Sequence, residues 1–109
     1  MEKHVELAYL LDLYGSLLTQ RQKSVLAQTV EEDCSLAEIA EREGISRQAV
    51  RDALVRAENQ LYAYEASLRL LELQKGLRAL RAALGSEDRA SLEARIDALL
   101  AADGGKDGI

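Results

Sequence analysis

Residues 35–61, SLAEIAEREGISRQAVRDALVRAENQL, constrain the fold more than any other part of the chain, because they combine two helical patterns with a three-residue turn. Ser35 followed by Glu38 fits a capping box, in which the hydroxyl and the carboxylate each bond a backbone N–H at the start of a helix. Gly44 stands where a left-handed backbone conformation would end that helix. Ser46 is expected to cap the next helix.

The apolar residues of this stretch have the spacing that a helix-turn-helix requires. Ala40 is small enough for two helices to approach, Ile45 anchors the turn, and Val50 is placed to pack back on the first helix. This combination is much rarer than a plain helical hairpin. We therefore predict a helix-turn-helix motif, with an ordinary hairpin inside a small helical bundle as the alternative.

Helix is favoured elsewhere too, because the 109 residues are dominated by Leu, Ala, Glu and Arg and contain no proline. These side chains lose little rotamer freedom in a helical turn. Residues 2–14 predict a first helix that ends at Gly15. Val5, Ala8, Leu11 and Leu18 stand at helical spacing with further apolar residues between them, so we expect this helix to be buried.

Further capping signals complete the predicted set of helices. Thr19 and Gln22 fit a second capping box, which would open a helix that runs to Val30. Ser86 is expected to cap a final short helix. The fold class is therefore all-α, with five helices and no strand.

Two apolar series follow the motif without a helix breaker. The first is heptad-like and comprises Leu54, Ala57, Leu61, Tyr64, Leu68 and Leu71. The second lies on a different face and comprises Leu70, Leu73, Leu77, Leu80 and Leu84. An unbroken helix from Arg47 to Leu84 would be about 57 Å long at about 1.5 Å per residue, with Gly76 as its weak point.

So small a domain cannot cover both apolar series along their whole length. Leaving a leucine in water forfeits roughly 1.5–3 kcal/mol, and large exposed apolar patches usually mark interfaces. We therefore expect a homodimer, with an interface formed by Leu61, Tyr64, Leu68, Leu71, Leu73, Leu77 and Leu80. The alternative is a monomer. In it, either the final helix covers the second apolar series, or the leucine-rich arm stays exposed until it binds a protein partner.

The expected domain organisation has three parts. A helix-turn-helix domain spans residues 1–65, a leucine-rich helical arm spans 66–102, and a disordered tail spans 103–109.

The sequence offers little for catalysis or metal binding. Cys34 is the single cysteine and His4 the single histidine, which leaves no cluster for zinc or iron. The acidic run at 31–33 lacks the alternating ligand spacing of a calcium loop. We therefore expect no enzymatic activity, no metal and no cofactor.

No apolar run approaches the roughly 20 residues that cross a bilayer, and the first residues do not resemble a signal peptide. We therefore expect a cytoplasmic protein without membrane contact.

The formal net charge of −5 counts against general affinity for DNA, which usually requires a basic surface. Positive charge is nevertheless present locally, since residues 46–58 contain three arginines against two acids. Asp52 would repel phosphate unless it accepts from a cytosine amino group. A solvated helix face without a ligand is the alternative interpretation.

The positions just after the turn of a helix-turn-helix face the major groove. Arginine can bond the O6 and N7 atoms of guanine, glutamine can pair with adenine, and serine suits phosphate. Further basic residues could reach the phosphate backbone. The candidate nucleic-acid-binding residues are therefore Ser46, Arg47, Gln48, Arg51, Arg56, Arg21 and Lys23.

The order of these motifs resembles known proteins. Residues 18–61 are similar to region 4 of bacterial sigma factors, which recognises a promoter element. The closer resemblance is to the YlxM family of small helix-turn-helix proteins, over roughly residues 5–75. It is carried by LYG at 13–15, LLT at 17–19, RQ at 21–22, SLAEIAE at 35–41, SRQAV at 46–50 and RAE at 56–58.

The resemblance implies a link to the signal recognition particle pathway of protein targeting, since the YlxM family is associated with the GTPase of that particle. Two classes of function remain open. In the first, the protein is a regulatory nucleic-acid binder that uses Arg47, Gln48 and Arg51 on promoter DNA or on the RNA of the particle. In the second, it is an adaptor that acts on the particle or its GTPase, with the helix-turn-helix kept as a scaffold.

Overall fold

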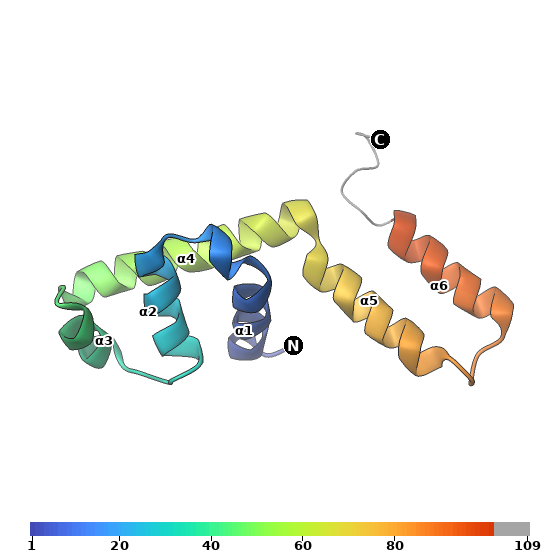
Figure 1. The fold of residues 1–109 in the computed structure, drawn as a ribbon, viewed down its shortest axis with the longest axis horizontal. Helices are drawn as coiled ribbons and strands as arrows, with labels where there is room; N and C mark the ends of the chain where they lie inside the picture. Colours follow the sequence, from blue (N-terminus) through green and yellow to red (C-terminus); the bar gives the residue numbers. More distant parts are fainter. Residues whose placement is uncertain (102–109) are drawn as a thin grey trace. The chain divides into compact units, whose positions relative to one another are not determined.

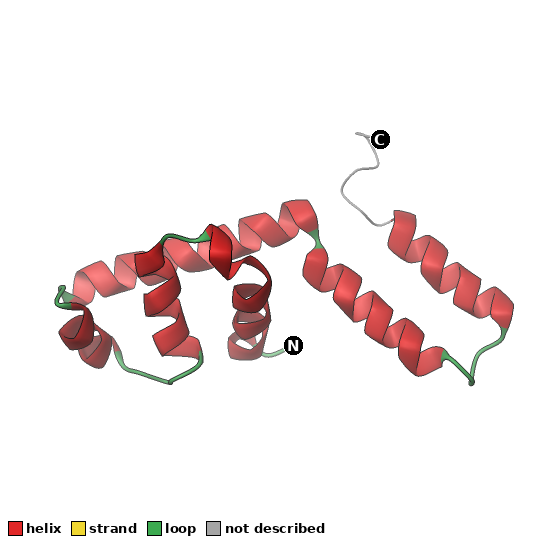
Figure 2. Ribbon diagram, in the orientation of Figure 1, coloured by secondary structure: helices red, strands yellow, loops and turns green. Residues whose placement is uncertain are grey.

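The computed structural model describes residues 1–101, which form six α-helices and one short 3-10 helix and contain no strand (Figures 1 and 2). The predicted all-α fold is confirmed. The chain divides into two compact units, Met1–Tyr64 and a second that begins at Glu65. The tail expected at 103–109 lies outside the described residues.

The first unit contains the helix-turn-helix. Its elements are α1 (Lys3–Tyr14), the 3-10 helix η1 (Gly15–Leu17), α2 (Gln20–Val30), α3 (Leu36–Glu43) and most of α4 (Arg47–Leu68). Figure 1 shows α1, α2 and α3 arranged along α4. The Thr19–Gln22 capping box is present: Gln22 N donates to Thr19 Oγ1 at 3.1 Å, and Thr19 N donates to Gln22 Oε1 at 3.2 Å.

Helix α1 is buried as expected, but only along one face. Its buried residues are Leu7, Leu10, Leu11 and Tyr14. Val5 is exposed, because it lies about 200° around the helix from Leu7 at about 100° per residue. The three leucines and the tyrosine offer more apolar surface than Val5 and Ala8, so they take the core-facing side.

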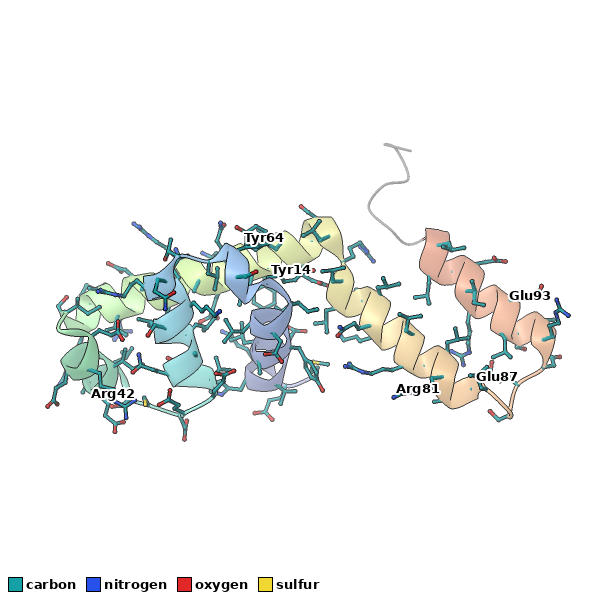
Figure 3. All side chains as sticks on the ribbon, in the orientation of Figure 1. Tyr14, Arg42, Tyr64, Arg81, Glu87 and Glu93 are labelled. Atoms are coloured by element: carbon teal, nitrogen blue, oxygen red, sulfur yellow. The ribbon has the colours of Figure 1, made fainter. Side chains whose placement is uncertain are left out.

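Leu61 and Tyr64, two residues expected at a dimer interface, pack within the first unit. Leu61 is completely buried. The ring of Tyr64 lies 5.9 Å from the ring of Tyr14 between centroids, and its hydroxyl donates to the Leu17 carbonyl at 3.4 Å (Figure 3). A side chain that is already buried within one chain has no apolar surface left to bury in a dimer. Leu61 is therefore a core residue, and its predicted place in a dimer interface is wrong.

The helix predicted from 47 to 84 is broken at Arg69, so the prediction of five helices is wrong. Arg69 has a left-handed backbone, with φ of 55°. The carboxylate of Glu65 accepts from Leu71 N at 3.0 Å and from Glu72 N at 3.1 Å. These bonds cap the separate helix α5 (Leu70–Ala83) and offset the cost of the left-handed residue.

The second unit is a helical hairpin of α5 and α6 (Arg89–Ala101). The predicted Ser86 cap is wrong: Asp88 Oδ1 accepts from Ser91 N at 2.9 Å, whereas the Ser86 hydroxyl donates to the Ala83 carbonyl at 3.1 Å. The left-handed Gly85 lies in the turn, so the chain reaches helical geometry only at Arg89. Asp88 is therefore the residue in position to cap.

The leucines expected to form an interface have unequal exposure. Leu71 is buried and Leu80 is half-buried. Leu68, Leu73 and Leu77 are 54%, 43% and 49% exposed. Pairing with α6 therefore leaves part of the leucine-rich face of α5 accessible.

Candidate nucleic-acid interface

The turn between α3 and α4 follows from local hydrogen bonds that the sequence anticipates. At the start of α3, Glu38 N donates to Ser35 Oγ at 3.1 Å and Ser35 N donates to Glu38 Oε1 at 2.9 Å. The latter bond is the main reason that the pKa of Glu38 lies below its ordinary value. At the end of α3, Gly44 has φ of 70°, and Ile45 N donates to the Ala40 carbonyl at 3.1 Å.

The motif is held together by a small apolar core. Val25, Ile39, Ala40 and Val50 are buried together, with Ile45 packed against them. These residues come from α2, α3, the turn and α4, so the core fixes the start of α4 against both preceding helices. The predicted roles of Ala40, Ile45 and Val50 are confirmed, and the opposite face of α4 is left to solvent.

Arg47, Gln48 and Arg51 form what we call the reading face. All three side chains are exposed, and at about 100° per residue they lie within an arc of about 100°. Within residues 1–101, neither arginine takes part in an ion pair. Ser46 precedes them and accepts from Ala49 N at 3.0 Å, so it is the predicted cap and keeps its hydroxyl hydrogen for another partner.

The other predicted basic residues do not join the reading face. Arg56 lies nine residues beyond Arg47 on the same helix, which places it about 180° away. Arg21 Nε lies 3.3 Å from Glu43 Oε1, so its charge is already paired. Lys23 is exposed and forms no ion pair among the described residues.

The end of α3 is tied to α2 by a polar network that sequence reasoning missed. Glu43 Oε2 accepts from Ser24 Oγ at 3.1 Å and from Gln28 Nε2 at 3.0 Å. Gln28 is a buried polar residue, so its bond to Glu43 replaces one that it would otherwise make with water. Ser24 and Gln28 are four residues apart on α2, and that spacing was the available signal.

Arg42 extends this network into the loop before α3. Its NH1 donates to Gln28 Oε1 at 3.4 Å, to Glu32 Oε1 at 3.0 Å and to Cys34 Sγ at 3.3 Å. The bond to Glu32 is the main reason that the pKa of Arg42 is raised. The network therefore ties the last turn of α3 to α2 and to the loop before α3, and so supports the position of the turn that leads into α4.

Two further residues of α4 belong beside the reading face. Asp52 Oδ1 accepts from Gln48 Nε2 at 2.9 Å, so the acidic side chain is engaged by a neighbour. Val55 is 53% exposed and lies between Gln48 and Arg51 when the helix is viewed down its axis. An exposed aliphatic residue on this face suits contact with a thymine methyl group. Sequence reasoning missed Val55, although its spacing from Arg51 and Gln48 was visible.

The described residues contain no group of three or more His, Cys, Asp or Glu side chains positioned to hold a metal ion. Over the same range, none of the helices combines the length and apolarity that crossing a bilayer demands.

Comparison with known proteins agrees with this geometry. Residues 1–98 match the model of UPF0122, whose description is "Putative helix-turn-helix protein, YlxM / p13 like". A UPF0122 protein of Clostridium botulinum is 51% identical over 78 residues, which cover 72% of this chain and 70% of that protein. A UPF0122 protein of Symbiobacterium thermophilum is 45% identical over 96 residues, which cover 87% and 90%. One from Fusobacterium nucleatum is 41% identical over 78 residues, which cover 72% and 76%.

Proposed function

Since this chain belongs to the UPF0122 family of YlxM / p13-like helix-turn-helix proteins, we propose that it is a non-enzymatic regulatory protein that binds duplex DNA. The observation that carries the proposal is the reading face itself. Two arginines that form no ion pair with the residues at 1–101, together with a glutamine, stand exposed in the first turns of α4, directly after the turn of the motif. These are the positions and side chains with which helix-turn-helix proteins contact base edges.

Groove dimensions favour DNA over RNA as the ligand. The major groove of B-form DNA, about 12 Å wide, admits an α-helix. The major groove of A-form RNA is deep and narrow, and side chains cannot read it. The arginines of the reading face are suited to guanine, and Lys23 and the Ser46 hydroxyl are suited to phosphate.

A salt series tests this proposal against a pool of duplex DNA and against signal recognition particle RNA. Affinity falls with salt with a slope of roughly −0.9 per phosphate contacted on a logarithmic plot. Because Arg21 is paired and the chain is acidic, we expect a slope of roughly −2 to −3 on DNA. The absence of duplex binding at low salt would overturn the proposal, and binding to the RNA alone would replace DNA with RNA as the ligand.

The proposed setting of this activity is the signal recognition particle pathway, to which the YlxM resemblance points. In this setting the protein regulates the pathway through nucleic acid. Measuring transcripts of the particle's genes with and without the protein tests the assignment. Unchanged transcript levels, in cells where the protein occupies DNA elsewhere, would separate the binding activity from this pathway.

A second candidate function, protein adaptor, is supported by the exposed leucines of α5. Leu73 and Leu77 stay about half exposed although α6 packs on the same helix. Such a surface fits either the GTPase of the particle or a second copy of this chain, which would make the proposed homodimer. Sedimentation equilibrium at micromolar concentration separates the two, because a mass near 12.0 kDa throughout contradicts a stable dimer.

A further inference from the structure

We propose that Asp52 is a positioning residue of the reading face, which turns Gln48 so that it selects a base that presents an amino group in the major groove. This inference rests on the proposed binding of duplex DNA by α4. It names the class of base, adenine or cytosine, that Gln48 reads.

The geometry starts from the hydrogen bond between Gln48 Nε2 and Asp52 Oδ1, which is 2.9 Å long. The two residues are four apart on α4, so their side chains lie one turn above the other on the same face. A carboxylate can only accept hydrogen bonds. The amide nitrogen of Gln48 must therefore face Asp52, and the amide oxygen Oε1 is directed away from it.

A glutamine without such a neighbour can present either end of its amide. With Oε1 outward it accepts from the N6 amino group of adenine or the N4 amino group of cytosine, and with Nε2 outward it donates to acceptors on guanine or thymine. Turning the amide over would bring Oε1 against the Asp52 carboxylate, oxygen against oxygen. Water relieves that repulsion in the free protein, but a groove from which water is excluded does not.

The same arrangement explains an acidic residue beside two arginines. The negative charge of Asp52 lowers affinity for every DNA sequence, because it repels the phosphate backbone. It raises the discrimination between sequences, because it removes one of the two orientations of Gln48. Arg47 and Arg51 donate to guanine, so the reading face offers donors at two positions and an acceptor at a third.

The test uses the full chain and a pool of random duplex DNA. Sequences are selected with the natural protein, with Gln48→Ala, with Asp52→Ala and with the double variant. We expect the natural protein to select a motif with one position restricted to adenine or cytosine, and Gln48→Ala to lose that restriction. Asp52→Ala should admit guanine and thymine there, with a loss of discrimination of about tenfold, while binding all duplexes several-fold more tightly.

The double variant separates positioning from charge. In the Gln48→Ala background, removing Asp52 should still raise the affinity for all duplexes but should leave the base preference unchanged. Discrimination that survives Asp52→Ala while it is lost in Gln48→Ala would overturn the inference and leave the proposed function standing. If the natural protein binds duplex DNA but selects no sequence, the inference alone fails. If it binds no duplex DNA, or only RNA, both the proposed function and the inference fail.

Discussion

Gly76 lies so close to Leu99 that a Cβ atom built on the glycine would stand 2.0 Å from Leu99 Cδ2. The Cγ atom of Leu99 would be 3.0 Å away, so the leucine side chain would have to shift as well as rotate its end to make room. Gly76 is thus a point of close packing between α5 and α6, although a glycine inside a helix ordinarily weakens it.

Gly76→Ala should destabilise the second unit by about 1–3 kcal/mol through overpacking. Alanine brings a gain of about 1 kcal/mol to a helix interior, so the net destabilisation should be up to about 2 kcal/mol. The measurement is the midpoint of chemical unfolding, followed by circular dichroism. The matched control is Gly76→Ala in a Leu99→Ala background, where the overlap is gone. There, Gly76→Ala should stabilise the protein relative to Leu99→Ala alone. A stabilising Gly76→Ala in the natural background would contradict the close packing.

Arg47→Ala and Arg51→Ala should each weaken DNA binding by about 1–3 kcal/mol if the side chain reads a base. Both residues are exposed, so the stability of the fold should hardly change. Arg56→Ala is the control, because it removes the same charge from the opposite side of α4. Equal losses in all three variants would mean that the arginines act through net charge alone, and the reading face would lose its support.

Glu43→Ala should have opposite effects on stability and on DNA affinity. Gln28 loses one hydrogen bond but keeps those to Ser24, so we expect a destabilisation of about 1 kcal/mol. Arg21 loses its ion-pair partner and becomes available for phosphate, which should strengthen binding. Glu41→Ala removes the same charge from an exposed position of α3. If the two variants raise affinity equally, the release of Arg21 contributes nothing.

Tyr62 predicts a pH dependence of stability at high pH. Burial, together with a hydrogen bond from its hydroxyl to Glu6 Oε1 of 2.8 Å, raises its pKa from 10.0 to about 12. The folded protein thus keeps the proton of the Tyr62 hydroxyl up to a higher pH than the unfolded chain does. The resulting stabilisation is fully present below pH 10 and is lost as the pH rises through about 12.

The check is a comparison of unfolding free energies for the natural protein and Tyr62→Phe across that range. The natural protein should lose more stability than the variant between the two pKa values, because phenylalanine has no proton to lose. Parallel curves for the two proteins would show that Tyr62 ionises equally in the folded and unfolded states.

Local signals in the sequence predicted much of the first unit. Thr19 and Ser35 open their helices as expected, because a capping box depends on residues only three apart. The positive φ of Gly44 was likewise predictable, since few other residues adopt it without strain.

The break at Arg69 could not be predicted in the same way. Apolar spacing continues through Leu68 and Leu71, and neither glycine nor proline marks the position. The cap comes instead from Glu65, which itself lies inside α4 and reaches six residues ahead. Ser86 and Asp88 posed a related difficulty, because both are residues that cap helices. Only the path of the turn decides between them.

The candidate site likewise has features that local sequence predicts and features that depend on residues far apart in the sequence. The exposed positions of Arg47, Gln48 and Arg51 follow from the helical repeat once the motif is recognised. The pairing of Arg21 with Glu43 joins residues that are far apart in sequence, so no local pattern contains it. The bond between Gln48 and Asp52 has a helical spacing and was accessible to sequence reasoning.

The Glu65 cap also makes the chain modular. Helix formation is cooperative, so an unbroken helix would couple the stability of its far end to the stability of its beginning. Here Leu71 and Glu72 find their acceptors on a side chain, and α5 has a nucleus of its own. The hairpin of α5 and α6 can therefore unfold while the start of α4, with the helix-turn-helix, keeps its structure.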